Sequence, residues 1–220
     1  MTIGAMNGHK PSSSLVACDS LLLLEEIQHR VANEYAVAIS TIDTLATDCD
    51  QRAKLVLSKV CDRLHSFASV HHALLPPRDD GMVDLCLYLS DVCSALAGAI
   101  LADRCISLVL HERPAVLAPR RAWRVALILS ELITNAAWHG RWPQGGGMIE
   151  IEIMPDGGMI MCRLSYDCAG AARPWVGRGM RIVEALAREL GGHMERDLGD
   201  RRAAFLLRFP SQPISGFRFG

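Results

Sequence analysis

The residues best suited to chemistry lie in the sequence ELITNAAWHG, residues 131–140, which places a carboxylate and a carboxamide four positions apart. On a helix, Glu131 and Asn135 share one face and lie one turn apart. The apolar residues before them would bury the opposite side of that helix. Oxygen ligands of this kind bind a hydrated hard cation and, through it, a phosphate. On spacing alone, an ordinary amphipathic helix with a polar face is the simpler explanation.

A glycine-rich segment downstream adds a possible phosphate site. Asp167 ends a predicted hairpin over residues 148–166, and Gly170 follows it. Gly177 and Gly179 then open a helical pattern. Glycines at this position let the backbone approach a ligand closely, and the free N–H groups of the helix start favour an anion. Together with residues 131–140, this segment favours a nucleotide or another phosphate ligand.

His29 is a candidate for covalent chemistry. It lies beside the apolar stripe of residues 21–45 rather than on it, so we expect an exposed imidazole. A neutral imidazole has a free ring nitrogen near pH 7 that can attack a phosphoryl group. A surface histidine without a task is the alternative, but the adjoining Arg30 and the nucleotide-type segment downstream favour a phosphoacceptor. His71 and His72 lie at a predicted helix end, where a structural or capping role suits them better.

Two apolar stripes predict the element that carries His29. Residues 21–45 and 57–74 are joined by the polar segment 47–52, which is typical of an antiparallel helical hairpin. A hairpin this thin cannot bury its own apolar surface, so we expect a homodimer through residues 19–76 that forms a four-helix bundle. Residues 1–18 carry Gly, Pro and a Ser run and are interpreted as a flexible tail.

The rest of the chain predicts a second domain, residues 77–210, followed by a C-terminal tail, residues 211–220. Helical and strand patterns alternate in it, with a hairpin before and after the helix at Gly179. This order predicts an α+β protein in which the hairpin precedes a two-layer α/β sandwich, with about three helices on one face of a mixed sheet. The other predicted elements are 83–102, 106–111, 148–154, 159–166, 180–190, 194–197 and 203–209, and a helix that starts at Ala118-Pro119 carries Glu131 and Asn135.

Composition limits the partners and the compartment. The net charge of −1 gives no electrostatic reason for nucleic acid or a membrane surface to bind. No uninterrupted apolar run is long enough to span a bilayer, and no secretory signal is present at the N-terminus. Eight cysteines are scattered without a CxxC pair, which indicates neither disulfides nor a metal site. We therefore expect a reduced, cytoplasmic protein.

The order of these parts resembles the ATP-binding domain of two-component histidine kinases. Residues 131–140 resemble the N-box of that domain. Asp167 with Gly170 is similar to the first glycine box, and Gly177-Arg-Gly179 to the second. The resemblance implies the histidine-kinase ATPase (Bergerat) type of sandwich, with ATP between the long helix and the glycine segment.

The N-terminal part carries a matching resemblance. LEEIQHRVAN, residues 24–33, is similar to the phosphoacceptor motif of the second histidine-kinase dimerisation family and the related HWE kinases. VHHALL, residues 70–75, resembles the end of that family's second dimerisation helix. The resemblance extends over residues 21–209, with its parts in the family's order.

The resemblance implies catalytic roles for three residues. His29 would accept the γ-phosphoryl group of ATP and pass it to an aspartate on a separate response-regulator receiver domain. Asn135 would hold the magnesium ion that bridges the nucleotide phosphates. Glu131 would orient a water molecule or act as a base. A separate sensor protein would then supply the input signal.

The resemblance also implies the residues that hold the nucleotide. Asp167 would accept a hydrogen bond from the adenine amino group, and Gly170 belongs to the same box. Gly177 and Gly179 would leave room for the phosphates. His139 would add a polar contact at the phosphate end.

Several positions depart from the family pattern. The first glycine box reads DCAGA, residues 167–171, where the family has Asp-x-Gly-x-Gly, and the segment between Gly170 and Gly177 is short. Trp138 and Ala32 replace lysines, which removes two positive charges near the transferring phosphate.

These departures keep two alternatives to the kinase open. In the first, a histidine phosphotransferase shuttles phosphoryl groups between receivers through His29 without ATP. In the second, a non-catalytic module docks another protein. The retained Glu131, Asn135 and Asp167 favour the kinase.

Overall fold

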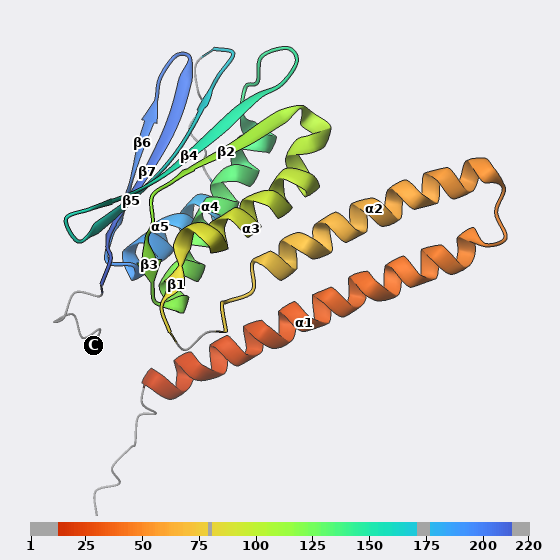
Figure 1. Cartoon of the computed structure of the whole chain (residues 1–220), viewed down its shortest axis with the longest axis horizontal. Helices are drawn as coiled ribbons and strands as arrows, with labels where there is room; N and C mark the ends of the chain where they lie inside the picture. Colours follow the sequence, from red (N-terminus) through yellow and green to blue (C-terminus); the bar gives the residue numbers. More distant parts are fainter. Residues whose placement is uncertain (1–12, 79–80, 171–176, 213–220) are drawn as a thin grey trace, which may run out of the picture.

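The computed structural model describes residues 13–78, 81–170 and 177–212 and consists of a helical hairpin beside an α/β sandwich (Figure 1). The hairpin is formed by α1 (Ser13–Ala46) and α2 (Gln51–Ala73). Asp50 begins α2, because its carboxylate accepts the backbone N–H of Ala53 at 2.8 Å. The helical hairpin and the following mixed sheet predicted from the sequence are therefore confirmed.

The first helix begins at Ser13, so residues 13–18, which the sequence analysis assigns to the tail, are helical. The difference has a physical reason, since a serine run is as typical of a helix start as of a loose segment.

The two helices pack along a narrow seam. Ile39 of α1 and Cys61 of α2 are buried in it, and the rings of Tyr35 and His71 lie 5.6 Å apart. Large apolar side chains remain exposed on the hairpin, which leaves part of its apolar surface without cover inside one chain. They are Ile27, Val37, Leu45, Leu55, Val56 and Val60.

The sandwich is a five-stranded mixed sheet with three helices on one face (Figure 1). The spatial order is β2-β4-β5-β7-β6; the β2–β4 pair is parallel and the other pairs are antiparallel. The strands are β2 (Ile106–Glu112), β4 (Gly147–Asp156), β5 (Met159–Asp167), β6 (His193–Leu198) and β7 (Arg202–Pro210). The helices are α3 (Leu85–Leu96), α4 (Pro119–His139) and α5 (Arg178–Glu189).

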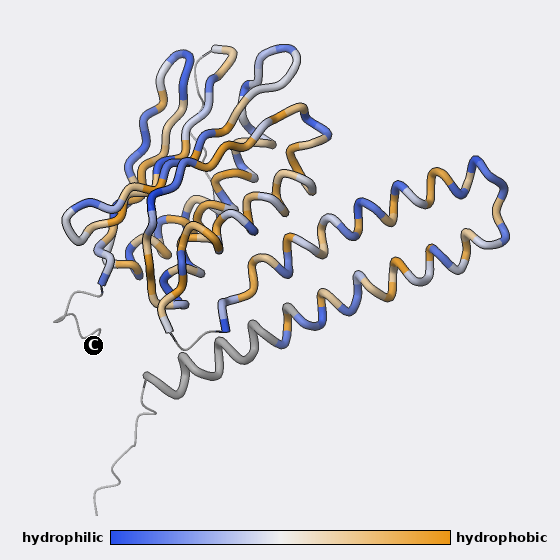
Figure 2. Tube along the Cα trace, in the orientation of Figure 1, coloured by the Kyte–Doolittle hydropathy of each residue, from blue (hydrophilic) through white to orange (hydrophobic). Residues whose placement is uncertain are grey.

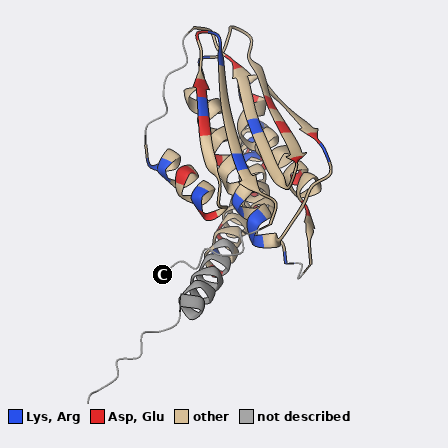
Figure 3. Ribbon diagram, turned by 90° about the vertical axis from the view of Figure 1, so that its left-hand side faces the viewer, with Lys and Arg blue, Asp and Glu red and all other residues tan. Residues whose placement is uncertain are grey.

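Alternation along the strands explains the layers. Ile149, Ile151 and Ile153 of β4 are buried against the helices, whereas Glu150 and Glu152 face the other side. Figure 3 shows charged residues along the strands, and Arg202 forms an ion pair with Glu150 at 2.9 Å. Figure 2 shows the apolar residues gathered where helices and sheet meet.

The predicted helix over residues 83–102 is divided into several elements. Val83–Asp84 forms the short strand β1, which pairs with β3 (Val116–Leu117). Asp84 then starts α3, because its carboxylate accepts the N–H groups of Cys86 and Leu87. A π-helical turn, Ala97–Leu101, and a 3₁₀ turn, Ala102–Arg104, end the segment.

The stretch Leu85–Arg104 is 20 residues long and apolar enough to cross a membrane by length and composition. This finding differs from the sequence analysis, which treated the charged residues in this region as interruptions. Leu89, Val92 and Leu96 are buried in the shared core of helices and sheet. Their burial explains the hydrophobicity of the stretch as that of a core helix.

Cysteines contribute to the same core. In the described part of the chain, seven cysteines are free thiols, and Cys86, Cys93, Cys162 and Cys168 are buried. Burial raises the pKa of Cys93 to about 12 and also raises the pKa of Cys162. These thiols therefore stay protonated and pack as small apolar groups.

The end of α2 is fixed to the sandwich. The indole N–H of Trp123 donates to the Leu74 carbonyl at 3.0 Å, and the Tyr88 hydroxyl donates to the Leu75 carbonyl at 3.0 Å. These two hydrogen bonds fix where the chain leaves the hairpin. In the middle of α2, Arg63 also forms an ion pair with Asp103 at 2.7 Å.

Candidate functional site

The predicted polar pair on α4 forms in the structure. Ala118 and Pro119 begin this helix, as the sequence predicts, and its apolar side is buried in the core. The amide nitrogen of Asn135 donates to Glu131 Oε1 at 2.9 Å, and both side chains are half-buried. This bond engages the amide nitrogen, not the carbonyl oxygen, which is the atom of Asn135 that could bind a cation.

The start of α5 packs directly against Glu131. A Cβ atom added at Gly179 would lie 1.8 Å from Glu131 Oε1 and 2.6 Å from its Cδ. The space that Gly179 leaves is therefore occupied by the carboxylate. Gly177 precedes α5 with an extended φ of 164° and has no atom within 4 Å of an added Cβ. Of the two glycines, only Gly179 is required by local packing.

Replacement of Gly179 by alanine should displace the Glu131 carboxylate and disturb its bond to Asn135. The Glu131 side chain can rotate away, so we expect a small loss of stability, about 1 kcal/mol, and a larger loss of any nucleotide binding at this site. Thermal unfolding and titration with a fluorescent ATP analogue measure the two effects. Gly177→Ala is the matched control for stability and should leave thermal unfolding unchanged, because an added Cβ there meets no atom within 4 Å. Equal losses of stability in the two variants would contradict this account of Gly179.

The first glycine box is held by backbone contacts. Asp167 is exposed at the end of β5, and the N–H groups of Cys168 and Ala169 donate to the carbonyls of Arg201 and Arg141. Gly170 has a φ of +103°, a region that favours glycine. An added Cβ there would lie 3.6 Å from the Arg141 guanidinium. The remainder of the lid segment, residues 171–176, lies outside the described residues.

Arg141 was not identified from the sequence. It brings a positive charge to the first glycine box, although a lysine is missing at position 138. Trp138 is exposed instead, and the Arg104 guanidinium lies 3.8 Å from the centre of its ring. His139 is exposed in the last turn of α4, one turn beyond Asn135. No sequence signal distinguished Arg141 from other surface arginines.

The structure offers few protein ligands for the magnesium ion that Asn135 is expected to hold. Within residues 13–78, 81–170 and 177–212, no group of three or more His, Cys, Asp or Glu side chains could hold a metal ion. A carboxamide oxygen can still contribute one ligand to a magnesium ion that keeps waters and phosphate oxygens as its other ligands. The Glu131–Asn135 pair therefore fits a cation that arrives with a nucleotide.

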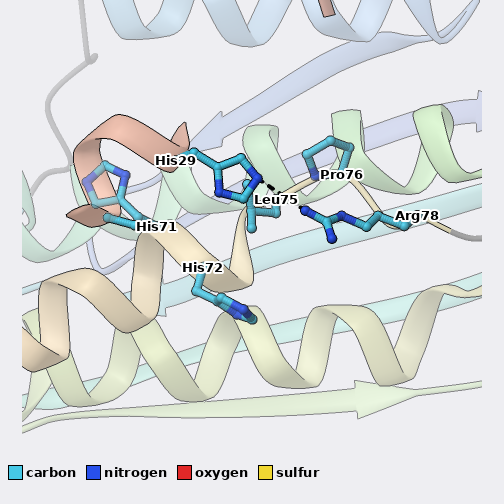
Figure 4. A pocket seen from close by; sticks show the side chains of 7 residues that line it. His29, His71, His72, Leu75, Pro76 and Arg78 are labelled. Carbon is cyan, nitrogen blue, oxygen red and sulfur yellow. Dashed lines mark hydrogen bonds between the residues drawn. The ribbon is translucent and has the colours of Figure 1, made fainter. Parts of the chain in front are cut away.

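His29 is exposed on α1 and faces the end of α2 (Figure 4). It lines a pocket of about 430 Å³ together with Ala32, His71, His72, Leu75, Pro76 and Arg78. An Nη2 donor of Arg78 lies 3.2 Å from His29 Nε2. The structure thus brings a linker arginine, which the sequence analysis did not single out, to the expected phosphoacceptor.

His71 and His72 differ in their surroundings. His71 packs against Tyr35 in the seam between the helices, which agrees with a structural role. His72 is exposed and lines the same pocket as His29. His72 is therefore a useful comparison for any experiment on His29.

Comparison with protein-family models matches residues 26–100 to HisKA_2, described as histidine kinase. The matched segment includes His29, α2 and most of the apolar stretch that follows β1. A search of the curated proteins gave no match.

Solved structures share the fold over most of the chain. The histidine kinase domain of the Erythrobacter litoralis EL346 blue-light activated histidine kinase is 21% identical, with a TM-score of 0.57, and the match covers 89% of this chain and 94% of that one. The longer EL346 protein is 22% identical, with a TM-score of 0.54 and coverage of 86% and 62%. A bacterial phosphotransferase determined at 1.7 Å is 13% identical, with a TM-score of 0.57 and coverage of 90% and 98%.

Proposed function

We propose that His29 takes the γ-phosphoryl group of ATP and passes it to a receiver aspartate, because residues 26–100 match the HisKA_2 histidine kinase family. The protein is then a cytoplasmic two-component signalling kinase that works as a homodimer. The observation that carries the proposal is the exposed imidazole of His29 within the matched segment 26–100.

The reaction consists of two phosphoryl transfers. The Nε2 lone pair of His29 attacks the γ-phosphorus, and the bond to the bridging oxygen breaks with its electron pair on ADP. In the second transfer, the receiver carboxylate attacks phosphorus and the electron pair of the N–P bond returns to Nε2. A magnesium ion bound with the nucleotide would neutralise phosphate charge during the first transfer.

The residues of the sandwich support ATP as the donor. The Asn135 carbonyl oxygen is the candidate ligand for the cation, and Glu131 is held beside it by a 2.9 Å hydrogen bond. Arg141 supplies a guanidinium at the first glycine box. Asp167 is exposed at the end of β5, where the adenine of a nucleotide can reach its carboxylate. Each of these groups contributes to nucleotide binding in the proposal.

A second candidate is a histidine phosphotransferase that exchanges phosphoryl groups between receivers through His29. The likeness to a bacterial phosphotransferase favours it, since the match covers 98% of that chain. The fixed end of α2 also favours it. Tyr88, Trp123 and Arg63 hold the hairpin against the sandwich, whereas transfer from a nucleotide requires the γ-phosphate to reach His29.

Incubation with γ-labelled ATP and magnesium, and separately with a labelled phosphorylated receiver, distinguishes the candidates. For a kinase, we expect acid-labile label from ATP that falls at least about 100-fold in Asn135→Ala. Ser130→Ala, on the same helix, is the control and should keep the label. Acceptance from the receiver without uptake from ATP would establish the phosphotransferase. No label from either donor would leave the docking module as the remaining function.

A further inference from the structure

The contact between Arg78 and His29 joins two distant parts of the chain. Arg78 lies in the linker that follows α2, and its Nη2 is 3.2 Å from Nε2 of His29 on α1 (Figure 4). The guanidinium carries only donors and remains protonated. The Nε2 atom must therefore accept this hydrogen bond with its lone pair, and the proton of the neutral ring lies on Nδ1.

The linker gives Arg78 a defined position. Leu74 and Leu75, just before it, accept hydrogen bonds from Trp123 and Tyr88 at 3.0 Å each. Pro76 and Pro77 follow, and each proline restricts the backbone to a narrow range of φ. The guanidinium therefore reaches the imidazole from a segment that the sandwich already holds in place.

The pocket around this contact has the chemistry to hold a small anion. Arg78 provides the fixed positive charge, and His72 provides a second ring. Leu75 and Pro76 form an apolar wall beside His29. A phosphoryl group on Nε2 would lie next to the guanidinium, which pairs well with phosphate oxygens.

We propose that Arg78 is a positioning residue for His29: it selects the tautomer with the lone pair on Nε2 and then pairs with the phosphoryl group bound there. This inference rests on the proposed function, because it assumes that His29 is the phosphoacceptor. During transfer, Nε2 forms the bond to phosphorus while the leaving group departs with its electron pair. The Arg78 donors move from Nε2 to the phosphoryl oxygens, and the Nδ1 proton stays on the ring or passes to water.

The proposal is tested with potassium phosphoramidate, a small donor that phosphorylates imidazole with loss of ammonia. This donor needs neither the nucleotide site nor a receiver, so the test is independent of both. We expect Arg78→Ala to slow phosphorylation of His29 about tenfold, because a charge-assisted hydrogen bond is lost. Arg78→Lys should recover part of the rate, since it keeps the charge but not the planar pair of donors.

Arg30→Ala is the matched control. Arg30 is exposed and adjacent to His29, and its ion pair is with Glu26. Removal of its charge should have little effect on the rate. Equal slowing by Arg30→Ala and Arg78→Ala would overturn the proposal, because only the general positive charge would then matter.

Nitrogen-15 spectra of the imidazole give a second measurement, the tautomer of His29, which would not change if Arg78 had only a structural role. At pH 8, the His29 ring should carry its proton on Nδ1 in the full-length protein and shift toward the Nε2–H form in Arg78→Ala. An unchanged tautomer in Arg78→Ala, at an unchanged rate, would overturn the inference. If Arg78 acts as expected on phosphoramidate but neither ATP nor a receiver labels His29, the proposed function fails and the positioning role stands.

Discussion

The His29→Ala protein should take up no acid-labile phosphate, either from ATP or from a phosphorylated receiver. Removal of the imidazole removes the nucleophile, and the expected loss is therefore at least about 1000-fold, down to the background of the assay. The fold should not change, because His29 is exposed on α1 and its described hydrogen bond is to the Arg78 guanidinium on the surface. Thermal unfolding beside the labelling assay checks this expectation.

His72→Ala is the matched control for this substitution. Its ring is exposed and lines the same pocket, so its removal changes the pocket without removing the proposed nucleophile. We expect His72→Ala to retain most of the label. Label that persists in His29→Ala but disappears in His72→Ala would show that the phosphoacceptor is His72 on α2 and not His29 on α1.

The elements that position this chemistry were largely predictable from the sequence, because their patterns are local. The alternation of isoleucines over β4, and the glycines 157 and 158 in a two-residue turn with φ of 53° and 85°, specify a hairpin without reference to the rest of the chain. Ala118-Pro119 likewise marks the start of α4. The boundary at Val83–Asp84 was missed, because β1 depends on pairing with β3, more than thirty residues away.

The candidate site was predictable only where its residues share one helix. Glu131 and Asn135 are four residues apart, and helical geometry alone brings them together. The contact between Gly179 and Glu131 requires packing of α5 on α4, which the spacing of residues does not give. Arg78 and Arg141 were missed for the same reason. Surface arginines carry no pattern, and only the folded chain shows which side chain each one approaches.

The exposed apolar residues of the hairpin are the reason to expect a dimer. Val37 and Leu45 of α1 are 66% and 62% exposed, and Val56 and Val60 of α2 are 58% and 42% exposed. A monomer would hold this surface in water at a cost of about 25 cal/mol for each Å² of apolar area. Pairing of two hairpins into a four-helix bundle would bury it.

The double variant Val56→Glu/Val60→Glu should therefore be a monomer. Each carboxylate would be buried without a partner in the bundle, at a cost of about 3 kcal/mol or more, and the four of them in a dimer raise its dissociation constant by about 10⁸-fold or more. Light scattering coupled to size-exclusion chromatography measures the change in mass. Lys59→Glu, a charge reversal beside Val60, is the control and should remain a dimer.

The same variant tests whether His29 can be phosphorylated without dimerisation. Val56 and Val60 lie in the first half of α2, whereas the pocket of His29 is formed at the end of that helix by residues such as His72 and Leu75. A monomer should therefore still accept phosphoryl groups from phosphoramidate at His29. If the double variant stays dimeric, the exposed apolar surface of the hairpin is not the interface. If the monomer also loses acceptance, the partner protomer contributes to the pocket.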